Sequence, residues 1–184
     1  MASTATAAER YSIGAIWFHW VMAALIVFNI IVGIFHEGVP ALRALMGAHK
    51  AIGITVLVLT IARMAWRLAH RPPPFASDVP GWERGLAIAV RRIFYVLMLV
   101  MPLSGWVMVS ASTHPRPLNW FGAFPIPFLP VGHDAGAPAS TTHAVLGYLF
   151  AALVVLHVVG ALRHHFVLRD SVLGRMIPGL QPRA

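Results

Sequence analysis

Four histidines stand inside long apolar stretches of this sequence, where an imidazole is costly unless something binds it. His143 and His157 lie 14 residues apart in one stretch, which is about four turns of a helix, so they share a face roughly 21 Å apart along its axis. His19 and His49 each stand in another apolar stretch. Sorted by depth, His19 and His157 lie near one membrane surface, and His49 and His143 lie near the other. The spacing therefore predicts one histidine pair in each leaflet.

Each predicted pair suits the axial ligation of a planar macrocycle, because two imidazoles on opposite faces can hold the iron of a b-type haem. Arg63 falls at the level of the first pair and Lys50 follows His49. Each cation is placed to meet a haem propionate, and an arginine fork matches a carboxylate. Small residues near or opposite the histidines would leave room for a flat group. They are Gly33, Gly53, Gly147 and Gly160.

Other interpretations of the four histidines stay open at this stage. A membrane histidine can hydrogen bond to a neighbouring helix, although four at matched depths are hard to explain in that way. A single zinc site needs its ligands together, whereas these fall at two levels. A metal or proton transporter would use the same side chains and would be colourless. Two further sets are interpreted as surface or interfacial residues: His36, His70, His114 and His133 in loops, and His164 and His165 at the cytoplasmic end of the last span, where a lipid-soluble substrate is an alternative partner.

The composition places the chain in the membrane class. Its 184 residues have a mean hydropathy of +0.74 and only 11% charged residues, whereas a soluble domain carries about 25%. The sequence has no cysteine, which excludes disulfides, iron–sulfur clusters and thiolate haem ligation. The formal net charge of +8 comes mainly from arginines that flank apolar segments, so we expect a membrane partner and no nucleic acid.

Four stretches are long and apolar enough to cross the roughly 30 Å hydrocarbon core as helices. The predicted fold class is therefore all-α, an integral membrane four-helix bundle that forms a single membrane domain over residues 1–184. The predicted spans are residues 13–35, 47–68, 86–110 and 142–166. A long outer loop rich in proline and glycine, residues 111–141, joins the last two spans.

The distribution of lysine and arginine predicts the orientation. Arg43, Lys50 and Arg116 lie on the predicted outer side, whereas the other 11 of the 14 basic residues lie towards the opposite side. Because positive charge accumulates on the cytoplasmic side, both chain termini are expected to be cytoplasmic.

The order and spacing of these residues resemble the bacterial cytochrome b561 family of small di-haem membrane proteins. The resemblance covers nearly the whole chain beyond Arg10 and rests on motifs in three spans and in the long loop. These motifs are Phe18-His19-Trp20, His49 with Gly53, Arg63 with Arg67, Trp120-Phe121, His143 with Gly147-Tyr148, His157, and His164-His165.

The resemblance implies two haems b per chain, one held by His19 with His157 and the other by His49 with His143. It implies a multi-pass protein of the bacterial inner membrane that takes electrons from superoxide and passes them to ubiquinone. The basic residues of the outer side would guide the superoxide anion by electrostatic steering. The alternative function is a haem b membrane anchor that transfers electrons within a dehydrogenase or hydrogenase complex.

Overall fold

The computed structural model describes residues 11–70, 72–75, 80–114, 116–177 and 180. Within these residues, four helices are long and apolar enough to cross a membrane. They are α1 (Ile13–Phe35), α3 (Met46–Ala69), α4 (Gly81–Ser110) and α5 (Gly136–Arg163). The predicted helical fold with four membrane spans is therefore confirmed, and a short helix, α2 (Pro40–Ala44), joins the first two of them.

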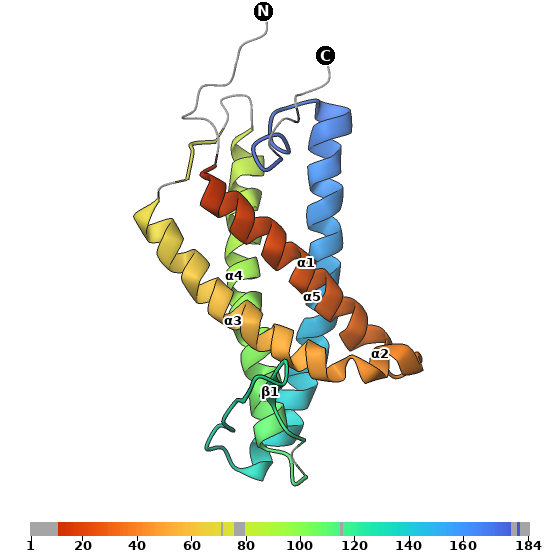
Figure 1. The fold of residues 1–184 in the computed structure, drawn as a ribbon. Helices are drawn as coiled ribbons and strands as arrows, with labels where there is room; N and C mark the ends of the chain where they lie inside the picture. Colours follow the sequence, from red (N-terminus) through yellow and green to blue (C-terminus); the bar gives the residue numbers. More distant parts are fainter. Residues whose placement is uncertain (1–10, 71, 76–79, 115, 178–179, 181–184) are drawn as a thin grey trace, which may run out of the picture.

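The four long helices form a bundle in two pairs (Figure 1). α4 and α5 run side by side along the long axis, while α1 and α3 pack on each other and cross that axis obliquely. The start of α1 and the end of α5 lie at one end of the bundle. We call this the inner end and the opposite end the outer end, following the predicted orientation, which stays a prediction.

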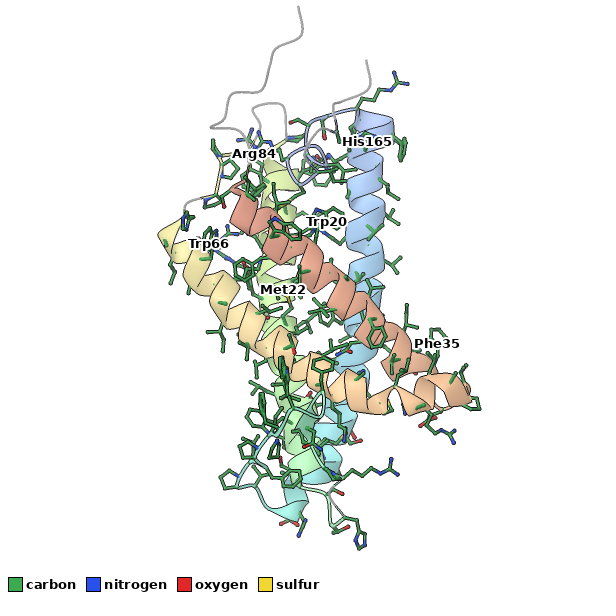
Figure 2. The ribbon with its side chains drawn as sticks, in the orientation of Figure 1. Trp20, Met22, Phe35, Trp66, Arg84 and His165 are labelled. Atoms are coloured by element: carbon green, nitrogen blue, oxygen red, sulfur yellow. The ribbon has the colours of Figure 1, made fainter. Side chains whose placement is uncertain are left out.

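A buried apolar cluster joins the helices at mid-height. In each helix that carries a predicted ligand, cluster members lie between the two histidine levels. On α5, for example, Phe150 stands midway between His143 and His157. The cluster separates the two levels with packed apolar side chains, among them Met22, which lies at mid-height of the bundle (Figure 2). Its buried members are Met22, Ile26, Ile52, Val56, Leu97, Met98 and Phe150.

The outer loop is shorter than the sequence pattern predicts. The reason is that α5 begins at Gly136 rather than at residue 142. At the other end of the bundle, α4 also begins earlier than predicted, at Gly81 rather than at residue 86. Proline and glycine in residues 136–141 indicated a loop, but Pro138 stands in the first helical turn, where a missing N–H costs nothing. A short 3₁₀ helix, η2 (His133–Ala135), precedes α5.

Within that loop, the aromatic segment forms a β-hairpin. β1 (Asn119–Trp120) pairs antiparallel with β2 (Phe124–Pro125). Phe121 and Gly122 between them have φ of 49° and 78°, the left-handed pair that a tight hairpin turn requires. The hairpin is fastened to the bundle, because Trp120 Nε1 donates to Thr55 Oγ1 of α3 at 3.0 Å.

At the inner end, the chain after α5 folds back over the bundle. A π-helical turn, η3 (His164–Leu168), ends at Arg169 with φ of 54°. Trp20 Nε1 of α1 then donates to the Met176 carbonyl at 2.8 Å, and Arg175 donates to the Pro74 carbonyl at 2.7 Å. These bonds place the described part of the C-terminal segment across the inner end.

Candidate functional site

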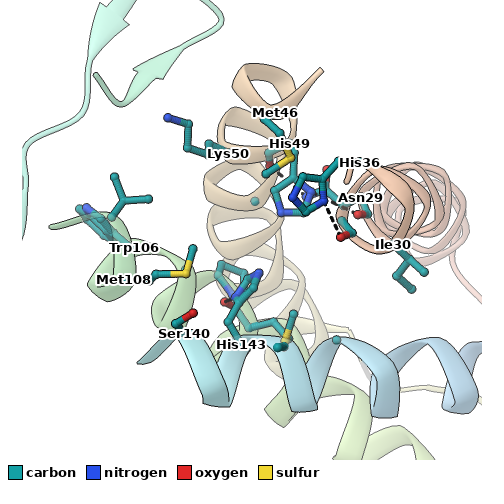
Figure 3. Close-up of a pocket in the computed structure, with 18 of the residues that line it drawn as sticks. Asn29, Ile30, His36, Met46, His49, Lys50, Trp106, Met108, Ser140 and His143 are labelled. Atoms are coloured by element: carbon teal, nitrogen blue, oxygen red, sulfur yellow. Dashed lines mark hydrogen bonds between the residues drawn. The ribbon is translucent and has the colours of Figure 1, made fainter. Parts of the chain in front are cut away.

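The outer histidine pair meets across a cavity. The rings of His49 on α3 and His143 on α5 have centroids 6.2 Å apart and planes inclined by 77°. Both side chains point into a cavity of about 1090 Å³ whose walls come from all four long helices (Figure 3). Ligand pockets are usually about 300–1,000 Å³, so this cavity suits a large group.

The inner pair meets with the same separation. His19 of α1 and His157 of α5 have ring centroids 6.2 Å apart and planes inclined by 66°. Aromatic rings flank this pair, since Trp20 lies 5.2 Å from His19 and Phe94 lies 5.2 Å from His157, centroid to centroid. α5 thus presents one imidazole at each level, and both pairs expected from the spacing are brought together.

These separations fit one metal ion held between two imidazoles. An imidazole nitrogen binds a metal ion at about 2 Å, and the ring centre lies about 1.1 Å behind that nitrogen, so two opposed rings have centroids about 6 Å apart. Each observed value is 6.2 Å. Two neutral imidazoles on opposite sides are also the donor set of a low-spin b-type haem. The residues present therefore fit haem at both levels.

The outer imidazoles have a fixed proton position. His49 Nδ1 lies 3.2 Å from the Asn29 carbonyl, and His143 Nδ1 lies 3.1 Å from the Met101 carbonyl. A carbonyl only accepts, so each Nδ1 carries the proton that is donated. This leaves Nε2 of each outer imidazole unprotonated and able to bind a metal ion.

Arg63 lies at the level of the inner pair, as the sequence spacing predicts. It lies within electrostatic range of both His19 and His157. Its guanidinium contacts Met22 Sδ at 3.9 Å and stands 5.9 Å from the centre of the Tyr95 ring. Among the described residues it forms no salt bridge, so a carboxylate of a bound group would find an unneutralised cation here.

Lys50 lies on the outer cavity but its ammonium group already has a partner. Its Nζ donates to the Pro117 carbonyl at 3.2 Å, which ties the start of α3 to the outer loop. Arg43 and Arg116 line the same cavity, as does one acidic residue, Glu37. The lining of the outer cavity therefore holds three basic side chains, Arg43, Lys50 and Arg116, against one acidic side chain.

Two of the loop histidines interpreted as surface residues stand on the wall of the outer cavity, and one of them, His114, is exposed as expected. His36 and His114 line the outer cavity, and His36 Nδ1 hydrogen bonds to the Gly33 carbonyl at 2.9 Å. The only signal in the sequence was the position of His36, one helical turn after Gly33. His165, expected at the interface, lies at the inner end of the bundle (Figure 2) and is only 7% exposed.

His164 belongs to a polar cluster that joins α4 to the end of α5. Its Nδ1 lies 2.5 Å from Asp170 Oδ2, and its Nε2 lies 4.0 Å from Glu83 Oε2. Arg163 completes the cluster with a 3.4 Å contact to Glu83 Oε1. The cluster fastens the inner ends of these two helices together.

Comparison with known proteins identifies the family. The family profile described as Prokaryotic cytochrome b561 matches residues 10–179. Cytochrome b561 homolog 2 of Escherichia coli (strain K12) is 31% identical over 185 residues, covering 92% of each chain. Cytochrome b561 homolog 1 of the same organism is 24% identical, covering 92% of this chain and 98% of the relative.

A third relative has a more specific name. The Probable superoxide oxidase CybB of Yersinia pestis is 30% identical over 134 residues, covering 71% of this chain and 73% of that protein. The family profile covers nearly the whole chain, and the four apolar helices agree with a multi-pass membrane protein. The chain therefore belongs to the prokaryotic cytochrome b561 family, whose members are membrane electron-transfer proteins that bind haem b.

Proposed function

We propose that this chain is a di-haem b cytochrome that passes electrons from superoxide at its outer end to ubiquinone in the membrane. The observation that carries the proposal is the pair of matched imidazole sites, each with centroids 6.2 Å apart, stacked along one bundle. His49 with His143 would hold one haem, and His19 with His157 would hold the other. When bound, haem b supplies a one-electron carrier.

Superoxide is favoured as the donor by the charge of the outer end. Arg43, Lys50 and Arg116 line the outer cavity with Glu37 as the acidic neighbour. A concave surface with one prevailing charge concentrates an ion of opposite charge and speeds its encounter. A relative named as a probable superoxide oxidase supports the same donor.

Ubiquinone is favoured as the acceptor because it dissolves in the membrane that the helices cross. The overall reaction balances when two superoxide anions each lose one electron and become dioxygen. One ubiquinone then takes both electrons and two protons and becomes ubiquinol. Within the chain, Arg63 would bind a propionate at the inner level, since arginine pairs with carboxylates through parallel hydrogen bonds.

Purification in mild detergent, with spectra of the oxidised and dithionite-reduced protein, tests the cofactor assignment. We expect two haems b per chain with sharp reduced bands of bis-histidine ligation. Mixing with superoxide should then form ubiquinol faster than spontaneous dismutation removes superoxide. A haem-free protein, made with adequate haem supply, would reject the cofactor assignment. No acceleration would reject superoxide as donor, and co-purification with a catalytic dehydrogenase would support the anchor function.

A further inference from the structure

Each outer imidazole packs against a neighbouring helix, and the two contact sites share the same elements: a backbone carbonyl that accepts the Nδ1–H, and a glycine one turn later. On α1, the backbone carbonyl of Asn29 accepts the Nδ1–H of His49 at 3.2 Å. The Asn29 side chain returns a bond, because its Nδ2 donates to the His49 carbonyl at 3.1 Å. Gly33 follows one helical turn later. We call Asn29 and Gly33 the α1 seat.

The second seat lies on α4 and holds His143. The Met101 carbonyl lies 3.1 Å from His143 Nδ1, and Ser104 Oγ lies 3.1 Å from the same nitrogen. The Ser104 hydroxyl donates to the Met101 carbonyl at 2.8 Å, so its lone pairs face the imidazole N–H. Gly105 follows Met101 by one turn. We call Met101, Ser104 and Gly105 the α4 seat.

The glycine in each seat sets how closely the imidazole approaches. A Cβ on Gly33 would lie 3.1 Å from His49 Cε1, and a Cβ on Gly105 would lie 3.0 Å from His143 Cε1. Carbon atoms at their best separation lie about 3.5–4.0 Å apart. Any side chain at these positions would therefore push the ring away from its carbonyl acceptor.

The inner pair has no equivalent seat among the described residues. The ring nitrogens of His19 and His157 make no hydrogen bond within that part of the chain, and the rings pack against Trp20 and Phe94 instead. Arg63 lies within electrostatic range of both imidazoles. The two levels therefore differ in what surrounds the same side chains.

We propose that the α1 and α4 seats are positioning elements that make the outer imidazoles stronger donors to iron than the inner ones. This inference rests on the proposed function. An N–H bond to a carbonyl fixes the orientation of a metal-binding imidazole and raises its basicity. A more basic ligand stabilises ferric over ferrous iron, so each seat lowers the reduction potential of the outer site. This effect favours the movement of electrons from the outer site to the inner one.

Ser104→Ala tests the proposal with the least disturbance of packing. Redox titration should show a higher potential at the outer site and an unchanged one at the inner site. A lost hydrogen bond of ordinary strength corresponds to about a two- to tenfold change in the equilibrium between the sites. Thr60→Ala is the matched control, because Thr60 Oγ1 also donates to a helix carbonyl, that of Val56, at 2.7 Å. It should move neither potential.

Gly105→Ala and Gly33→Ala test the close approach. Either should alter the electron paramagnetic resonance signal of the outer ferric haem, or remove that haem, and leave the inner signal intact. Gly85→Ala in α4 is the control, since a Cβ there meets nothing within 4 Å. If the wild type holds two haems and the seat variants change neither spectrum nor potential, the seats are packing only. A wild type without an outer haem would instead reject the proposed function itself.

Discussion

The two ends of the bundle hold the same pair of side chains in different surroundings. At the outer end, the imidazoles donate to helix carbonyls and border a cavity lined by three basic side chains. At the inner end, they pack among aromatic rings beside Arg63, beneath the folded C-terminal segment. The spacing of the two histidines on α5 thus sets the positions of the two sites along the bundle. The neighbouring helices supply the hydrogen bonds, aromatic contacts and charges that make the two sites different.

The largest expected effect is the loss of haem from one end of the bundle when one histidine of α5 is removed. We expect His143→Ala to lose the outer haem alone and His157→Ala to lose the inner haem alone, so that each halves the haem content. The reason is that each imidazole serves one level only. Pyridine haemochrome assay per polypeptide checks this, with His133→Ala, an exposed histidine, as the control. Complete loss of haem in either variant would show that the sites depend on each other.

A change at Arg63 should act on the inner end alone. A unit charge about 10 Å away in a medium of effective dielectric constant near 20 is worth about 1.7 kcal/mol. This energy corresponds to roughly 70 mV for a one-electron couple. We therefore expect Arg63→Gln to lower the inner potential by tens of millivolts, measured by redox titration. Arg63→Lys retains the charge and should shift it less; equal shifts in both variants would mean that charge is not the cause.

Charge reversal at the outer opening should slow the encounter with superoxide. Arg116→Glu is expected to reduce the rate of haem reduction several-fold at low ionic strength, with the difference shrinking as salt screens the charges. Stopped-flow mixing with superoxide over a salt series measures this. Arg92→Glu, an exposed site in the inner half of α4, is the matched reversal and should have little effect. A rate of haem reduction that does not change with salt concentration in either variant would contradict electrostatic steering of superoxide.

The smallest expected effect is on the free energy of unfolding, when the hydrogen bond between the outer hairpin and α3 is removed. Thr55→Val removes the oxygen that accepts the Trp120 Nε1–H at 3.0 Å, and we expect the free energy of unfolding to fall by about 1 kcal/mol. Thermal unfolding in detergent checks the change against Thr141→Val, an exposed threonine of α5. A loss as large as that of a buried core truncation would mean that the hairpin contributes far more than one hydrogen bond.

The features that depend on side-chain type and on the period of the helix could be predicted from the sequence. Sequence reasoning placed α1 within its observed bounds and paired all four histidines as the structure brings them together. It also noticed Gly33, because that glycine stands 14 residues after His19. The spacing of apolar residues and the cost of a polar group in the membrane determine these features.

Features that depend on backbone groups of another helix had no signal in the sequence. The Asn29 and Met101 carbonyls accept from histidines that are 20 and 42 residues away, and every residue has a carbonyl. Gly105 was not singled out for the same reason. The burial of His165 likewise had no signal in the sequence, since it lies in a π-helical turn that follows α5.

The position of α5 in the chain has a consequence for how the protein is made. This helix is the last of the four to leave the ribosome, and it carries one histidine of each pair. It packs mainly on α4 and only lightly on α1. Neither histidine pair is complete until α5 has been made. A chain truncated before Gly136 would lack this helix and would enter the membrane with one imidazole at each level and neither pair complete. Such a chain would be a natural substrate for membrane proteases that remove unfinished proteins.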